Sequence, residues 1–69
     1  MCVSEKIRVL AAMKNISIAE IARRLNTSPQ SFSGKLKRES FTIHDLEEIA
    51  EVVGVEFEYS FNFNDGKKV

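Results

Sequence analysis

The chain has 69 residues, of which 43% are hydrophobic and 29% charged, and its formal net charge is zero. This length supports one small domain, and such a composition excludes a largely disordered or low-complexity chain. The lone Cys2 excludes an intramolecular disulfide, and the chain has neither a signal-peptide core nor an apolar run of about 18 residues, so we expect a cytoplasmic protein that does not span a membrane.

Two short helices are predicted in the first part of the chain. Ser4 is the expected N-cap of the first helix, and Asn15 is expected to end it because Asn tolerates a left-handed backbone. Ser17 and Glu20 have the spacing of a capping box for the second helix, and Asn26 stands where that helix should end. One apolar face is expected in each helix: Ile7, Leu10 and Ala11 in the first, and Ile18, Ile21, Ala22 and Leu25 in the second.

A third helix is predicted over residues 29–37, after a link of only about three residues. Ser28 is its expected N-cap, and Pro29 occupies the first helical position, where its missing N–H is not needed. Phe32 and Leu36 are four residues apart, so they should be buried on one face.

A fourth helix is predicted from Thr42, whose side chain should cap it together with Asp45, to Gly54, which should close it. Its apolar face is expected to contain Leu46, Ile49, Ala50 and Val53. From Val55 the apolar period changes from 3.6 to 2, which predicts a β-strand over residues 55–63. The "NDG" turn after it leaves three residues for a returning arm, so a short hairpin is the other form this segment could take.

The net charge of zero conceals two halves of opposite sign. Residues 1–38 contain eight cationic and two acidic side chains, a balance of +6, whereas residues 39–69 contain two cationic and eight acidic ones, a balance of −6. This separation predicts a basic surface for a polyanion, with the acidic half directed away from it.

Two short helices joined by a tight turn, the second of them rich in small polar and basic residues, have the layout of a helix-turn-helix, whose second helix enters the DNA major groove. The run "SIAEIARRLNTSPQSFSGKLKRESFTIHDLEEIAEVVGVEFEYSF" resembles the Cro and phage-repressor (XRE) type of this motif, as found in small regulators of Gram-positive bacteria and their phages. The resemblance covers about residues 4 to 63. It implies a compact repressor-like domain that binds operator DNA, commonly as a dimer. We therefore expect a mainly α fold with four helices, a DNA-binding segment over residues 1–54 and a C-terminal β tail over residues 55–69.

The resemblance places Ser17 and Ser28 at helix starts that face phosphates, and Gln30, Ser31 and Gly34 on the surface that faces base edges. Gln30 is the first candidate for direct readout because its amide can bond both N6 and N7 of adenine. Cationic side chains at the end of the third helix suit phosphate contacts. The predicted DNA-binding residues are Ser17, Thr27, Ser28, Gln30, Ser31, Ser33, Gly34, Lys35, Lys37 and Arg38.

The alternating tail should need a partner, because an isolated strand or hairpin is marginal in water. We expect two copies to pair through it, antiparallel about a two-fold axis, with folding back onto its own helices as the alternative. The predicted dimer residues are Val55, Phe57, Tyr59, Phe61 and Phe63.

The sequence shows no pattern of catalytic, metal-binding or cofactor-binding residues, so we expect no enzyme activity, metal, cofactor or small-molecule substrate. The function predicted is that of a DNA-binding transcriptional regulator, and a repressor in particular. The alternative from another class is a protein-interaction module, such as an antitoxin-like partner or an adaptor, in which the helix-turn-helix is only a scaffold.

Overall fold

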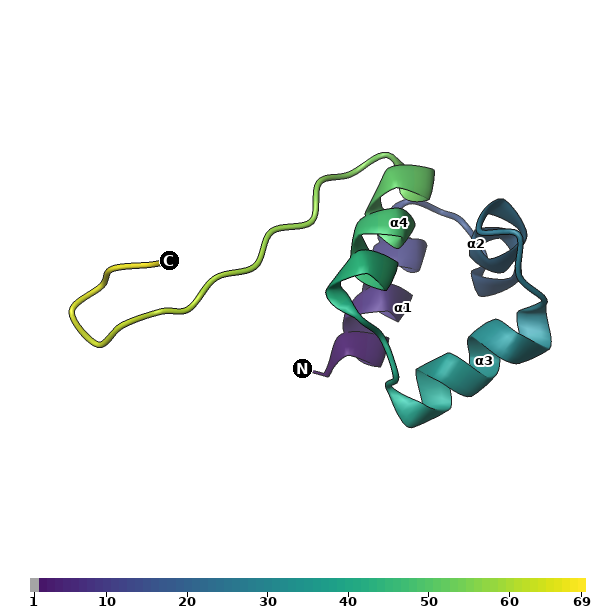
Figure 1. Cartoon of the computed structure of the whole chain (residues 1–69). Coiled ribbons are helices and arrows are strands. Elements are labelled where there is room, and N and C mark those ends of the chain that lie inside the picture. The colour runs from purple at the N-terminus through teal and green to yellow at the C-terminus, as the bar shows by residue number, and fades with distance from the viewer. Residues whose placement is uncertain (1) are drawn as a thin grey trace.

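Four helices form the body of the protein in the computed structural model, which describes residues 2–69. Met1, the first residue of the predicted DNA-binding segment, lies outside the described part. The helices are α1 (Val3–Met13), α2 (Ile18–Arg24), α3 (Pro29–Arg38) and α4 (Ile43–Val53). Residues 55–69, here called the tail, extend away from the helices (Figure 1). The prediction of a mainly helical fold with four helices is confirmed.

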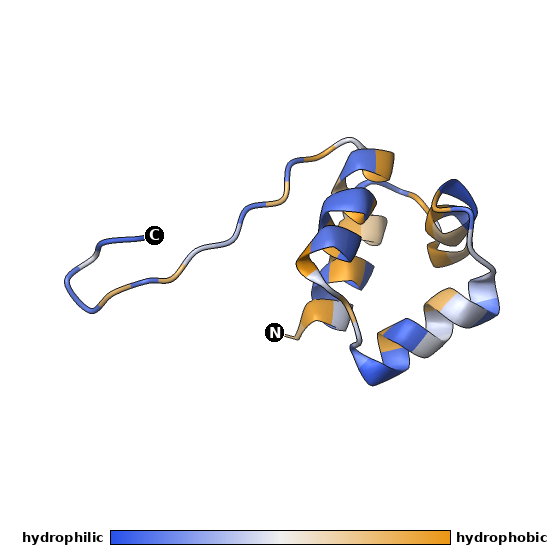
Figure 2. Ribbon diagram, in the orientation of Figure 1, coloured by the Kyte–Doolittle hydropathy of each residue, from blue (hydrophilic) through white to orange (hydrophobic). Residues whose placement is uncertain are grey.

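The core is built from the apolar face of each helix. Ile21 and Ala22 of α2 are completely buried, and Phe32 of α3 is 2% exposed. The Phe32 ring meets the Phe41 ring edge to face, with centroids 6.0 Å apart. Figure 2 shows the contrasting tail, where hydrophobic and hydrophilic positions alternate without a core. The buried core residues are Ile7, Ala11, Ile21, Ala22, Phe32, Leu36, Ile49 and Val53.

Local signals set most helix boundaries as predicted. The hydroxyls of Ser17 and Ser28 accept hydrogen bonds from backbone N–H groups in the first turns of α2 and α3. Thr42 forms the complete reciprocal capping box with Asp45 at the start of α4. Asn15, Asn26 and Gly54 have φ angles of 55°, 58° and 79°, the left-handed conformation that ends helices.

The predicted role of Ser4 as an N-cap is wrong. Cys2 stands at the N-cap position and makes no side-chain capping bond, while Ser4 lies inside α1 and is buried. The Ser4 hydroxyl donates to the Leu36 carbonyl at 2.6 Å, so its partner is the last turn of α3. The Ser4 N–H donates to Oε1 of Glu39 at 3.3 Å. A carboxylate distant in sequence therefore stabilises the start of α1 in place of a local cap.

Glu39 connects the end of α3 to the start of α1. Its φ of 52° makes it the left-handed C-cap of α3. The Cys2 thiol and the Ser4 N–H hold the pKa of its carboxyl below the usual range. Because the folded pKa is lower than the unfolded one, the carboxylate stabilises the fold above the unfolded pKa, and this contribution disappears as the pH falls through the folded pKa.

We expect Glu39→Gln to lower the melting temperature by a few degrees at pH 7, because the neutral amide is a weaker partner for the α1 N-terminus. The difference from the parent chain should shrink as the pH falls below 4.5, the ordinary pKa of the group. Thermal unfolding followed by circular dichroism between pH 7 and pH 2 measures both effects. Glu47→Gln, on the exposed face of α4, is the matched control. An equal loss at every pH would contradict the role given to the charge.

The strand predicted over residues 55–63 is not formed, and the prediction is wrong, because residues 55–60 have no neighbouring strand to bond with. The described tail contains only an isolated antiparallel bridge between Asn62 and Lys68. Around it, the Phe61 N–H donates to the Val69 carbonyl at 2.6 Å and the Phe63 N–H donates to the Lys67 carbonyl at 2.8 Å. These bonds close a small hairpin over residues 61–69. A short hairpin was the other form predicted for this segment.

Candidate nucleic-acid interface

The turn between α2 and α3 is fixed by backbone hydrogen bonds to α2. The N–H groups of Leu25 and Thr27 both donate to the Ala22 carbonyl, at 3.1 and 3.0 Å. Asn26, between them, adopts the left-handed conformation, which reverses the chain direction within one residue. Ala22 itself is completely buried, which leaves no space for a longer side chain. The orientation of α3 relative to α2 is therefore determined by short-range bonds and close packing.

One side of α3 is buried and the opposite side is open to solvent. Phe32 and Leu36 fill the core, whereas Gln30, Ser33 and Lys37 are exposed. A shallow surface hollow is lined by Pro29, Gln30, Ser33, Gly34 and Lys37. Four of the predicted DNA-binding residues, Gln30, Ser33, Gly34 and Lys37, thus share one face, here called the α3 face.

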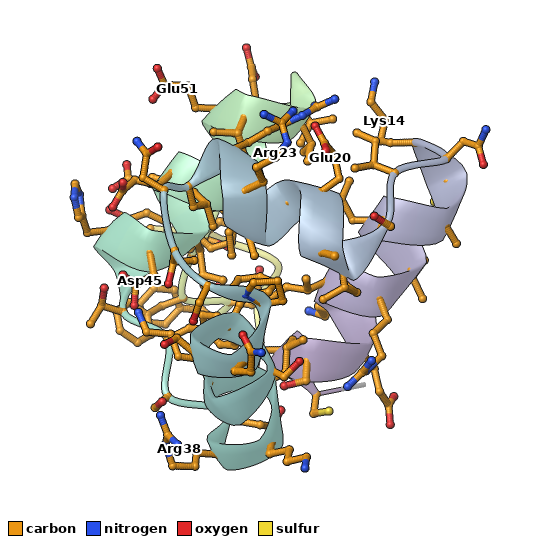
Figure 3. The ribbon with its side chains drawn as sticks, turned by 90° about the vertical axis from the view of Figure 1, so that its right-hand side faces the viewer. Lys14, Glu20, Arg23, Arg38, Asp45 and Glu51 are labelled. Carbon is orange, nitrogen blue, oxygen red and sulfur yellow. The ribbon has the colours of Figure 1, made fainter. Side chains whose placement is uncertain are left out.

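Arg38 bends back over Gly34. A Cβ atom added to Gly34 would lie 3.0 Å from Nη1 of Arg38, so the guanidinium occupies the space that a side chain at position 34 would take. Figure 3 shows Arg38 at the end of α3. The absence of a side chain at Gly34 lets this cation lie along the helix, an arrangement not foreseen from the sequence. The four-residue spacing of Gly34 and Arg38 was the available signal.

Three serines at the helix starts are predicted to contact DNA, and each of them makes hydrogen bonds within the chain. The Ser28 hydroxyl accepts from the Ser31 N–H at 3.1 Å and donates to the Ser31 hydroxyl oxygen at 3.0 Å. The two hydroxyls of this first turn are thus hydrogen-bonded to each other. The Ser17 hydroxyl accepts from the Glu20 N–H at 3.0 Å. These bonds fix the first turns of both helices. The phosphate contacts of Ser17 and Ser28 and the place of Ser31 at base edges stay predictions.

Lys35 and Thr27 lie away from the α3 face. Nζ of Lys35 is 3.4 Å from Oδ2 of Asp45, at the start of α4. Both Lys35 and Thr27 line a small hollow of about 110 Å³ that also includes Phe41 and Asp45. The Thr42 N–H, with help from the Lys35 charge, lowers the pKa of the Asp45 carboxyl. This ion pair was not predicted from the sequence, and the DNA contacts of Thr27 and Lys35 stay predictions.

The two arginines of α2 are also paired. Nε of Arg23 and Nε of Arg24 donate to the Glu20 carboxylate at 2.9 and 3.0 Å. The Arg23 bond, followed by the Arg24 bond, lowers the pKa of Glu20 to about 2. Arg24 also donates from Nη1 to the Val52 carbonyl at 2.8 Å, which joins α2 to the last turn of α4. Figure 3 shows Arg23 and Glu20 together on α2.

These pairings engage the two arginines of α2 and Lys35 and, in the described part of the chain, leave two cations at the end of α3 unpaired. Within residues 2–69, the ion pairs of the structure include neither Lys37 nor Arg38. Glu51 of α4 lies far from these cations, and Figure 3 places it at the end of the molecule opposite to Arg38. The α3 face therefore combines an amide, a hydroxyl and the Lys37 cation, with Arg38 bent over Gly34 beside it. Such a set is suited to a polyanion that also presents hydrogen-bonding edges.

The described residues offer little for other kinds of site. In residues 2–69, no three His, Cys, Asp or Glu side chains gather as a bound metal ion would require. None of the four helices has the length and apolar composition needed to cross a bilayer. The α3 face is thus the candidate site that the chain's own chemistry supports best.

Comparison with known protein families gives a match over most of the chain. A family model described as a Cro/C1-type HTH DNA-binding domain matches residues 6–58, which include α2, α3, α4 and most of α1. No curated protein and no solved structure matches the chain.

Proposed function

The chain belongs to the Cro/C1-type helix-turn-helix DNA-binding family, and from this membership we propose that it is a sequence-specific transcriptional regulator acting as a repressor in the cytoplasm. In this proposal residues 1–54 bind an operator by inserting α3 into the major groove. The tail joins two copies, so that two α3 helices reach half-sites about 34 Å apart. Repression then follows from occupying the operator.

The observation that carries the proposal is the composition of the α3 face. Gln30, Ser33 and Lys37 point to solvent from a helix whose other side is held in the core by Phe32 and Leu36. An α-helix fits the major groove, where amides and hydroxyls meet base edges and cations meet the flanking phosphates. Rigid attachment of the helix matters because base readout needs side chains in fixed positions.

Gln30 is proposed as the main base-reading side chain. It lies in the first turn of α3, the part of a recognition helix that reaches base edges, and its amide matches the N6 and N7 edge of adenine. Lys37 and Arg38, at the other end of α3, are proposed to bind phosphates and to set the register of the helix. Ser31 is proposed to face base edges together with Gln30 and Gly34.

We expect Gln30→Ala to relax specificity at one or two base positions, at a cost of about 1–3 kcal/mol on the best site. Affinity for unrelated duplexes should stay almost unchanged, because the substitution removes no charge. Selection of bound fragments from a random duplex pool, compared between parent and variant, measures the change. Ser40→Ala, in the exposed link after α3, is the control. Equal weakening on all sequences would contradict a base-reading role.

Duplex binding as a function of salt tests the proposal as a whole. Several phosphate contacts require the logarithm of affinity to fall linearly with the logarithm of salt concentration. Fluorescence anisotropy with a labelled duplex, from low to high salt, gives this slope directly. If no duplex binds at low salt, the regulator proposal fails and the interaction-module alternative stands.

A further inference from the structure

An apolar hollow of about 500 Å³ lies between α1, α4 and the first part of the tail, and is here called the α1–α4 groove. Val3 and Leu10 of α1 and Leu46 of α4 contribute apolar walls. Phe57 and Tyr59 of the tail line another side, with their rings stacked at a centroid distance of 5.7 Å. The groove is therefore an open apolar surface on the body of the protein.

The end of the tail exposes apolar side chains to solvent. Phe61, Phe63 and Val69 are 78%, 54% and 71% exposed on a hairpin held by few hydrogen bonds. Figure 1 shows this hairpin (residues 61–69) projecting away from the four helices. A lone two-stranded hairpin is marginal in water, and adjacent exposed aromatic side chains mark an interaction surface.

We propose that the hairpin of each copy occupies the α1–α4 groove of a second copy, in a reciprocal two-fold exchange. The inference rests on the proposed function, because it supplies the dimer contact that would present two α3 helices to DNA. It replaces the expected pairing of two strands with docking of aromatic side chains in an apolar groove.

Charge complementarity supports a second copy as the occupant. The hairpin brings Lys67 and Lys68, whereas the charged residues lining the groove are Glu56, Glu58 and one lysine, Lys6. An adjoining hollow adds the acidic residues Glu47 and Glu51 of α4. Two-fold exchange therefore places the cationic arm of each copy beside the acidic border of the other.

The path of the chain explains why a hairpin does not fill its own groove. Residues 55–60 already line the groove of their own copy, so the hairpin begins where that groove ends. The exposed side chains of the hairpin therefore lie beyond the groove of their own copy. Burial of Phe61, Phe63 and Val69 against groove walls in both copies reaches about 1,000 Å² in total, the lower size of a specific interface.

Directed disulfide formation tests the exchange. Cys2 is exposed and precedes Val3, a groove residue, so a cysteine at position 69 should reach Cys2 of the other copy. The parent chain, with Cys2 alone, is mixed with an isotope-labelled C2S, V69C chain under a mild copper–phenanthroline oxidant. We expect the mixed disulfide dimer to exceed both self-linked dimers in the mass spectrum. Self-linked products in excess, or no linked product, would overturn the proposal.

A chain with both cysteines, made by Val69→Cys alone, separates exchange from folding back. Exchange yields a covalent dimer, whereas an intramolecular disulfide would show that the hairpin fills its own groove and would overturn the proposal.

Sedimentation provides the second measurement. The parent chain should have about twice the 7.8 kDa mass of one chain, and the double variant F61S, F63S should fall to the monomer mass. Met13→Ser removes a side chain that is 79% exposed outside the groove, and should remain a dimer. A parent monomer, or a dimer unaffected by the double variant, would overturn the proposal.

Duplex binding distinguishes failure of this inference from failure of the proposed function. A monomer that binds DNA would overturn the groove exchange alone. An exchanged dimer that binds no duplex at low salt would overturn the DNA-binding proposal alone.

Discussion

Replacing Lys37 and Arg38 together with alanine is expected to weaken binding to every duplex by roughly 10- to 100-fold at about 0.1 M salt. The slope of log affinity against log salt should decrease by about 2, because two phosphate contacts are lost. In the described residues these cations have no ion-pair partner, so their charge is free for DNA. Anisotropy titrations with a specific and an unrelated duplex measure both quantities.

The matched control is the double variant R8A, K14A, which removes one arginine and one lysine from exposed positions in α1 and at its C-cap, outside the α1–α4 groove. It changes the net charge equally but leaves the α3 face intact. We expect a much smaller loss of affinity and an almost unchanged slope. An equal effect of both double variants would mean that binding depends on net charge, and the placement of α3 against the duplex would have to be abandoned.

Helix boundaries were predictable because their causes are local. Ser17, Ser28 and Thr42 cap helices whose first turns contain their hydrogen-bond partners three residues away. Gly54 ends α4 through its own backbone conformation. Ser4 was predicted wrongly because its partner, the Leu36 carbonyl, is 32 residues away in the sequence. A capping pattern cannot distinguish a hydroxyl that caps its own helix from one buried against another.

The α3 face was predictable from helical periodicity, since burial of Phe32 and Leu36 leaves Gln30, Ser33 and Lys37 on the outside. The partner of Lys35 was not, because its pairing with Asp45 depends on how α3 meets α4. Glu20 stands three and four residues before Arg23 and Arg24, so helical spacing was the available signal for their pairing, and counting charge along the chain did not use it.

The tail shows the limit of the two-residue period. Alternation of apolar side chains indicates an extended segment with one apolar face. A β-strand also needs a neighbouring strand whose backbone accepts and donates its hydrogen bonds. Residues 55–60 have no such neighbour in the structure, and only Phe61 and Phe63 bond to the returning arm. The alternation of apolar residues is therefore present without the strand, and the interaction surface of the tail stays a prediction.

Ala22→Leu is expected to destabilise the protein by about 3 kcal/mol, the upper part of the usual range for overfilling a packed core. Ala22 is completely buried, and its carbonyl receives the two N–H bonds that hold the turn before α3. The total stability of a domain of this size is about 3 to 10 kcal/mol, so a large fraction is lost. Thermal unfolding should show a melting temperature lower by more than about 10 °C.

Ala19→Leu is the matched control, because Ala19 is an exposed residue of the same helix α2. Alanine and leucine both favour helices, so this change should shift the melting temperature by only a few degrees. The two variants together separate crowding between α2 and α3 from any general effect of leucine in α2. If both melt at the same temperature, the helices have room for a larger side chain at position 22. The angle between α2 and α3, on which the presentation of Gln30 depends, would then be set by something other than the close contact at Ala22.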